Sequence, residues 1–165
     1  MSGRCWVVMG PAGSGKTTIG VRLAERLGWR FLEGDDYHPA ANREKMLRGE
    51  SLTDDDRRPW LDSLAAAIGG CLAAGDDVVV ACSALKRSYR DRLRAAGASR
   101  FILLDVPREV LSERLDRRPV EMIRPDLLES QLITLERPIG DELDVEVVDG
   151  NRPVDEVVEA VVGGG

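Results

Sequence analysis

The chain has 165 residues, of which 43% are hydrophobic and 32% are charged, and this balance is typical of one soluble domain with a single sizeable core. The formal net charge of −6 argues against a broad electrostatic grip on nucleic acid or on an anionic membrane, and no stretch is long enough to span a bilayer. Three cysteines without C-x-x-C spacing argue against a disulfide framework and a zinc site, so we expect reduced thiols and a cytoplasmic location.

Apolar runs alternate with helix-like patterns along the chain. We place Pro59 in the first turn of its helix, where a missing N–H costs little. The alternation predicts one α/β domain over residues 1–165, with three layers and a five-stranded parallel sheet covered by helices on both faces. In chain order, the expected elements are a strand at 5–9, a helix at 16–27, a strand at 30–32, helices at 42–48 and 59–74, a strand at 78–82, a helix at 87–95, a strand at 101–105, helices at 108–117 and 126–135, a strand at 145–148 and a helix at 154–162.

A glycine-rich loop joins the first expected strand to the first helix. Its sequence, Gly10-Pro11-Ala12-Gly13-Ser14-Gly15-Lys16-Thr17, has the spacing G-x-x-x-x-G-K-[ST] of a phosphate-binding P-loop. Backbone N–H groups of such a loop cradle phosphate oxygens, while the lysine reaches the β- and γ-phosphates and the threonine hydroxyl binds Mg²⁺. We therefore expect a bound nucleoside triphosphate and Mg²⁺, contacted by Gly10, Ala12, Gly13, Ser14, Gly15, Lys16, Thr17 and Thr18.

Several enzyme classes share such a loop, and the rest of the chain separates them. A GTPase should carry an N-K-x-D guanine motif, which does not occur, and the chain is short for the additional modules of most motor ATPases. The remaining candidates are compact P-loop kinases that act on nucleotides or on small metabolites.

The second strand is followed by Glu33-Gly34-Asp35-Asp36-Tyr37-His38-Pro39, which places carboxylates beside the P-loop in a parallel sheet. Asp35 is the first candidate to orient the acceptor hydroxyl and accept its proton, or to hold Mg²⁺ through water. Asp36 is equally well explained as a solvated loop residue. His38 precedes a proline, which favours an extended backbone, and its ring either faces the pocket or has a structural role.

Three further blocks carry a family resemblance that covers about residues 7–153. The blocks are Gly34 to Pro39 with Asn42, Lys45-Met46, Gly49 and the run 52–61; the run 82–86 with Tyr89-Arg90-Asp91 and Leu93-Arg94; and the run 127–131 with the run 135–138. On these blocks the chain resembles the small gluconate kinases. The resemblance implies ATP-dependent phosphorylation of D-gluconate at the 6-hydroxyl to give 6-phosphogluconate, on a P-loop kinase fold that is usually a homodimer.

The resemblance also implies a substrate site. An anionic sugar acid in an acidic protein needs a local reversal of charge, and arginine binds a carboxylate through two parallel hydrogen bonds. Lys86 and Arg90 lie four residues apart and share one helix face, which is either substrate-facing or simply exposed. Arg57 is otherwise a salt-bridge partner of the aspartates before it. The implied substrate residues are Asp35, His38, Lys45, Arg57, Lys86, Arg90 and Gln131. For Gln131 the alternative is a pairing on its own helix surface.

A lid at about 118–125 is expected between two helices. Arg114 and Arg118 lie four apart on one helix face and would close over the phosphates, with Arg118 joining Lys16 and Asp35 as a catalytic residue and Arg124 as a further candidate. The family usually has Gly-His-Phe and another apolar residue where this chain has Val120-Glu121-Met122-Ile123. A glutamate cannot donate to phosphate, so this change bears on closure, turnover and the identity of the acid.

The turn before the last helix holds Asn151, which either borders the adenine ring or serves only as a turn residue. Two alternatives to a gluconate kinase remain open at this point. One is a kinase for another sugar acid or hydroxy acid, such as shikimate. The other is a nucleotide-binding regulator with little turnover.

Overall fold

The computed structural model describes residues 3–117 and 125–164. Its single sheet has the strand order β2-β3-β1-β4-β5, and every neighbouring pair is parallel. The predicted five-stranded parallel sheet is therefore confirmed. The strands are β1 (Cys5–Met9), β2 (Arg30–Glu33), β3 (Val78–Ala81), β4 (Ala98–Asp105) and β5 (Val145–Asp149).

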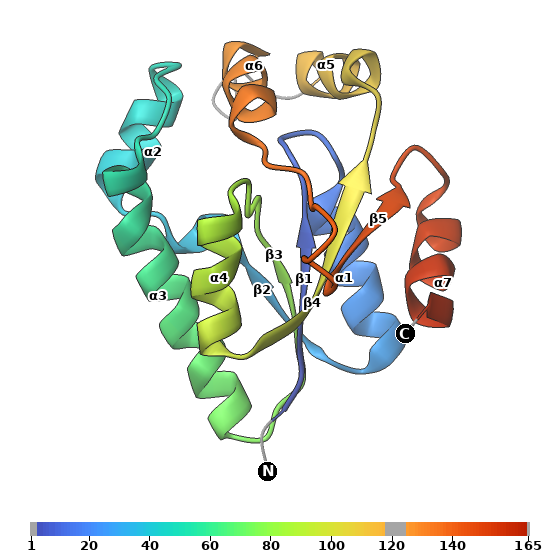
Figure 1. Ribbon diagram of the computed structural model, residues 1–165. Helices are drawn as coiled ribbons and strands as arrows, with labels where there is room; N and C mark the ends of the chain where they lie inside the picture. The colour runs from blue at the N-terminus through green and yellow to red at the C-terminus, as the bar shows by residue number, and fades with distance from the viewer. Residues whose placement is uncertain (1–2, 118–124, 165) are drawn as a thin grey trace.

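Helices cover both faces of this sheet and its carboxyl edge (Figure 1). One face carries α1 (Lys16–Leu27) and α7 (Val154–Gly164), and the other carries α3 (Asp54–Ala73) and α4 (Arg87–Ala96). Three helices stand beyond the carboxyl ends of the strands, where ligands collect in parallel sheets. They are α2 (Ala40–Leu47), α5 (Arg108–Asp116) and α6 (Pro125–Thr134), and a short 3₁₀ turn, η1 (Gly34–Tyr37), leads from β2 towards α2.

The core is split by the sheet into two apolar clusters. Val7 and Met9 point towards α3 and α4, whereas Val8 points towards α1 and α7, and all three are fully buried. Each such side chain contributes roughly 1.5–3 kcal/mol by leaving water. A third, smaller cluster joins Ala12 of the P-loop to Leu111 of α5 and Leu128 of α6, so the loop rests on packed helices.

The start of α3 differs from the prediction. The helix begins at Asp54 rather than near Pro59, because Thr53 and Asp56 form a capping box: Thr53 Oγ1 accepts from the Asp56 N–H at 3.1 Å, and the Thr53 N–H donates to Asp56 Oδ2 at 2.9 Å. Pro59 thus lies inside the helix and offers no N–H to the carbonyl of Asp55. The additional turn carries Arg57 to the edge of the sheet where the site lies.

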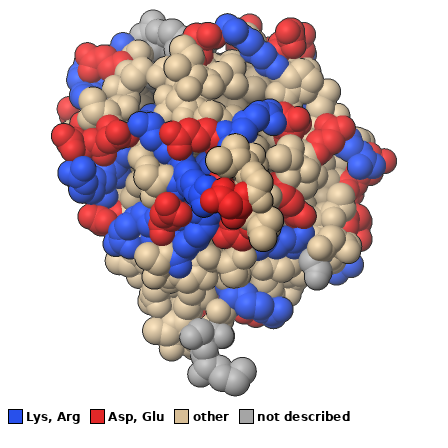
Figure 2. Space-filling view, in the orientation of Figure 1, with Lys and Arg blue, Asp and Glu red and all other residues tan. Residues whose placement is uncertain are grey.

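No helix among the described residues is both long enough and apolar enough to cross a membrane. Figure 2 shows Lys and Arg side chains interspersed with Asp and Glu over the face seen in Figure 1. Positive and negative charge therefore alternate on this face instead of separating into two regions.

Candidate active site

The P-loop is shaped to hold an anion. Gly10, Gly13 and Gly15 have φ angles of +144°, +84° and +97°, in the region that side chains disfavour, and a Cβ on Gly10 would lie 2.8 Å from Ser14 Oγ. The Ser14 hydroxyl is buried and has no hydrogen-bond partner within residues 3–117 and 125–164. A buried polar group without a partner is costly, and a phosphate oxygen would supply one.

Two oxygen atoms at the end of the loop fit a magnesium ion. Thr17 Oγ1 donates to Glu33 Oε2 at the end of β2. Burial raises the pKa of the Glu33 carboxyl, and a bound cation would oppose that shift. Mg²⁺ takes few protein ligands beside substrate phosphates. Within the described parts of the chain, no group of three or more His, Cys, Asp and Glu side chains gathers as a metal site.

A hollow on the α1 side of the P-loop fits the nucleotide. It is lined by Gly13, Ser14, Gly15, Thr18, Ile19, Arg114, Gly150, Arg152 and Val154, and its volume is about 270 Å³. Arg114 Nη1 donates to the Gly13 carbonyl at 3.0 Å, so the predicted arginine lies at the loop. Asn151 lies between two lining residues, and its N–H donates to Asp149 Oδ1 at 2.9 Å within the turn.

A second pocket opens beside the first and brings together side chains from the η1 turn, α2, α3 and α6. Lys16 lines it, and its Nζ donates to the Pro11 carbonyl at 3.1 Å. Four predicted substrate residues line it as well, namely Asp35, His38, Arg57 and Gln131. The remaining described lining residues are Ala12, Met46, Glu50, Ser51, Leu52, Trp60, Ser83, Leu85 and Ser130.

Asp35 stands at the mouth of this pocket, in the η1 turn. Its side chain is exposed, and its backbone N–H donates to Glu33 Oε1 at 3.3 Å, which fixes the turn to the end of β2. Lys16 and Asp35 line the same pocket, so a hydroxyl bound there lies between the P-loop and a carboxylate. This arrangement suits proton acceptance during phosphoryl transfer.

His38 is buried in the wall of the pocket. Its ring stacks on Trp60 with centroids 4.2 Å apart and an interplanar angle of 15°, and its Nδ1 lies 3.1 Å from Asn42 Nδ2. Burial is the largest cause that lowers the pKa of the His38 imidazole to about 4; Asp35 opposes this shift, and Arg43 and Arg57 add to it. The ring is therefore neutral at neutral pH.

Arg57 is the cation best placed for a substrate carboxylate. Its side chain is buried, its Nη1 donates to Tyr89 Oη at 2.9 Å, and no carboxylate in the described residues lies within ion-pair distance of it. The nearby Asp54 pairs with Lys86 Nζ at 2.9 Å and accepts from the Tyr89 hydroxyl. The aspartate thus neutralises Lys86 and leaves the charge of Arg57 available.

Lys86 and Lys45 are not among the described lining residues. Lys45 Nζ donates to Asp56 Oδ2 at 2.7 Å, so both lysines pair with acidic residues of the first turn of α3. Gln131 does line the pocket, where its Oε1 accepts from the Ala12 N–H of the P-loop at 2.7 Å. Its side chain therefore connects α6 to the P-loop.

Comparison with known proteins decides the family. The family described as an AAA domain matches residues 5–137. A gluconokinase from Gluconobacter oxydans is 46% identical over 160 residues, which are 96% of this chain and 89% of that protein. The chain belongs to the gluconokinase family.

Solved structures agree with this assignment. A gluconokinase from Sinorhizobium meliloti has 46% sequence identity and a TM-score of 0.82, with 99% of this chain and 91% of that chain covered. A sugar kinase from Janibacter sp. has 42% identity and a TM-score of 0.90, with coverage of 98% and 93%. The predicted family is thus confirmed, and the gluconokinase fold extends over almost the whole chain.

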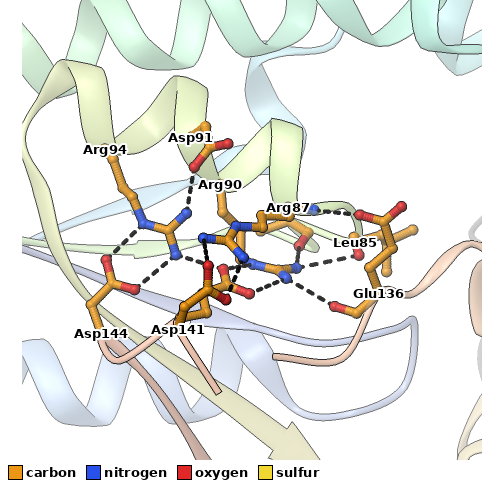
Figure 3. A network of polar contacts seen from close by, with 10 residues as sticks. Leu85, Arg87, Arg90, Asp91, Arg94, Glu136, Asp141 and Asp144 are labelled. Carbon is orange, nitrogen blue, oxygen red and sulfur yellow. Dashed lines mark hydrogen bonds and ion pairs between the residues drawn. The ribbon is translucent and has the colours of Figure 1, made fainter. Parts of the chain in front are cut away.

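The prediction that Arg90 binds substrate needs a correction, because in this gluconokinase fold Arg90 does not line the acceptor pocket. It is fully buried beneath α4, where Nη2 donates to Glu142 Oε1 at 2.7 Å and Nη1 donates to the Ala84 carbonyl at 2.9 Å (Figure 3). Ala84 has a φ of +46°, a conformation that costs free energy and needs support. Arg90 therefore holds the loop that carries Ser83 and Leu85 into the pocket, instead of binding substrate.

The expected lid lies outside the described residues. This applies to Arg118 and Arg124, and also to Glu121, Met122 and Ile123, where the chain departs from the usual gluconokinase sequence. Of the arginines predicted to close over the phosphates, Arg114 is described, and it lies at the P-loop.

Sequence reasoning missed three residues of this gluconokinase site. Glu33 contacts Thr17, and its position directly before Gly34-Asp35 at the strand end was an available signal. Asn42 and Tyr89 belong to the family blocks but had no role, because their roles depend on contacts with His38 and Arg57 that the sequence does not reveal.

Proposed function

We propose that this chain transfers the γ-phosphoryl group of ATP to the 6-hydroxyl of D-gluconate, giving 6-phosphogluconate and ADP. The observation that carries the proposal is one pocket beside the P-loop. It contains a carboxylate, Asp35, and a buried cation, Arg57, which has no acidic partner among the residues that the structure describes. The family relatives named above support the same activity.

Asp35 acts on the acceptor. Its carboxylate accepts a hydrogen bond from the 6-hydroxyl, aims the oxygen at the γ-phosphorus and takes the proton as the new bond to phosphorus forms. Arg57 holds the carboxylate at the other end of the sugar acid, so the chain length of the substrate sets which hydroxyl reaches Asp35. The pocket therefore selects both the charge and the length of the acid.

Lys16 and the loop amides act on the donor. The Nζ of Lys16 neutralises charge on the phosphate oxygens, the hydroxyl of Ser14 donates a hydrogen bond to one of them, and Arg114 lies close enough to add positive charge from α5. Thr17 and Glu33 would hold Mg²⁺, which supplies further neutralisation of the phosphates when bound. We also propose that Arg118 of the lid contributes to transfer, in line with the family resemblance.

We further propose that the protein is a cytoplasmic homodimer. The exposed apolar side chains Ile139 and Leu143, which lie 69% and 89% exposed before β5, fit a contact between copies. The three cysteines are free and buried, as expected in a reducing compartment. Analytical ultracentrifugation tests the dimer, and a monomer at all concentrations would contradict it.

A coupled assay of ADP release over a panel of sugar acids tests the activity. We expect gluconate to give rapid, ATP-dependent release and shorter or longer aldonates to give much less, with NMR of the product showing phosphate on the 6-oxygen. Release with another acid but not with gluconate would identify a different acid kinase. Binding of ATP without release for any acid would favour a regulator.

A further inference from the structure

His38, Asn42 and Asp56 form a chain of contacts that fixes the position of one proton. Asn42 is 3% exposed, and its Nδ2 lies 2.8 Å from the Asp56 carbonyl oxygen and 3.1 Å from His38 Nδ1. A carbonyl oxygen can only accept, so the amide atom beside it must be the NH₂ group. The reversed amide would place two acceptors 2.8 Å apart in a buried site.

This orientation decides the tautomer of the imidazole. An amide NH₂ group donates and does not accept, so His38 Nδ1 has to be the acceptor and carries no proton. The proton of the neutral ring is then on Nε2. No described residue bonds to Nε2, and His38 lines the acceptor pocket.

The ring itself is held in place from its flat side. Trp60 stacks on it at 4.2 Å, and the Trp60 Nε1–H donates to the Gly34 carbonyl at 2.8 Å. Ring position and proton position are therefore set by different residues: Trp60 fixes the first and Asn42 the second.

We propose that Asn42 is a positioning residue that keeps the proton of His38 on Nε2, so that His38 presents a neutral N–H donor to an oxygen of the bound sugar acid. A protonated Nε2 can donate to either a carboxylate or a hydroxyl oxygen, whereas a bare Nε2 would repel a carboxylate. The identity of the acid rests on the proposed function, but the assignment of the proton does not.

The tautomer can be read directly, because the chain contains one histidine. Protein labelled with ¹⁵N-histidine gives a single set of imidazole signals, in which a protonated and a bare ring nitrogen differ clearly. We expect Nε2 to be protonated and Nδ1 to be bare in the ligand-free wild type at neutral pH. A proton on Nδ1, or rapid exchange between both nitrogens, would overturn the proposal without any variant.

Asn42→Asp tests the link to substrate. A carboxylate can only accept, so we expect the proton to move to Nδ1, the KM for gluconate to rise about tenfold or more, and the KM for ATP to stay within about twofold. The matched control is Ala41→Asp, which adds the same charge at the neighbouring exposed position of α2 and should change neither the spectrum nor either KM. A moved proton with an unchanged gluconate KM would overturn the substrate role.

A second pair of variants remains informative if Asn42→Asp does not fold. The amide nitrogen of glutamine reaches the position of Nε2, whereas that of asparagine reaches the position of Nδ1. We expect His38→Gln to keep a several-fold lower gluconate KM than His38→Asn, and equal losses would overturn the proposal. If the wild type shows the expected tautomer but does not phosphorylate gluconate, the proposed function fails while the proton assignment stands.

Discussion

Asp35 and Arg57 line the same pocket. In the proposed function they serve different chemistry, since Asp35 accepts a proton and Arg57 binds a negative charge. Asp35 is exposed at the pocket mouth, whereas Arg57 is 8% exposed and tied to Tyr89. Substitutions at the two positions should therefore affect different kinetic constants.

Asp35→Asn removes the proton acceptor but keeps the shape of the side chain. We expect kcat with gluconate to fall by about 10²- to 10⁴-fold, because general-base catalysis contributes that much, while the affinity for ATP is retained. Steady-state kinetics and nucleotide titration measure the two quantities. Asp36→Asn is the matched control at an exposed neighbour that does not line the pocket. Near-normal turnover of the Asp35 variant would remove this residue from catalysis.

Arg57→Met removes the cation but keeps most of the buried stem. We expect the KM for gluconate to rise about 10- to 100-fold, since a charge-assisted hydrogen bond contributes roughly 1.5–3 kcal/mol. Arg58→Met provides the control, because Arg58 is exposed and pairs with the exposed Asp55 three residues before it on α3. Equal effects of the two variants on the gluconate KM would contradict the role of Arg57.

At the scale of elements, α4 is joined to the segment before β5 by ion pairs of very different burial. Arg90 and Glu142 are both buried, and Glu142 also accepts from Arg94. Arg87, on the same helix, pairs with the exposed Asp141 at 2.8 Å (Figure 3). The two pairs offer a comparison within one helix.

Breaking the buried pair should destabilise the fold far more than breaking the exposed one. For Arg90→Met we expect a loss of about 3–5 kcal/mol in the free energy of unfolding, because Glu142 loses its buried partner and keeps only the partly exposed Arg94. For Arg87→Met we expect at most about 1 kcal/mol. Urea denaturation measures both, and similar losses would contradict the structural role of Arg90.

The same pair makes stability depend on pH. Hydrogen bonds from Arg90 and Arg94 lower the pKa of the Glu142 carboxyl from its ordinary 4.5 to about 2. A lowered pKa contributes stability that is complete above the ordinary value and is lost as pH falls towards the folded value. Between about pH 4.5 and pH 2, the unfolding free energy of the wild type should fall more steeply than that of Glu142→Gln. Parallel slopes would contradict this.

These elements also show where sequence reasoning succeeds and fails. The bounds of α1 are as predicted, because the P-loop glycines before it and Gly28 after it are local signals. The start of α3 was missed, although its capping box Thr53 to Asp56 is equally local. Arg90 was misassigned for a different reason, since its partner Glu142 lies 52 residues away and only the fold brings them together.

At the scale of the whole molecule, two binding sites meet at the carboxyl edge of one sheet. The nucleotide hollow and the acceptor pocket share the P-loop, and Gln131 of α6 bonds to Ala12 between them. Ser51 Oγ donates to Ser130 Oγ at 2.8 Å, which ties the segment after α2 to the same helix. The sites are adjacent, and Lys16 lines the acceptor pocket as well. In the proposed function, however, Lys16 binds phosphate and Arg57 binds the substrate carboxylate, so we expect that binding at each site can be disabled alone.

Thermal melting with single ligands should separate the two sites. A ligand at about 100 times its Kd adds about 2.7 kcal/mol, which for a domain of this size raises Tm by about 5–10 °C. We expect Lys16→Ala to lose the shift caused by a non-hydrolysable ATP analogue and to keep the shift caused by gluconate. Arg57→Met should keep the shift caused by the ATP analogue and lose the shift caused by gluconate, whereas Arg58→Met should keep both shifts.

Two outcomes would contradict this picture. A wild type that responds to the analogue but not to gluconate would contradict a gluconate pocket, and a variant that loses both shifts would contradict the independence of the two sites. Because these shifts measure binding without turnover, they also separate a defect in recognition from one in phosphoryl transfer.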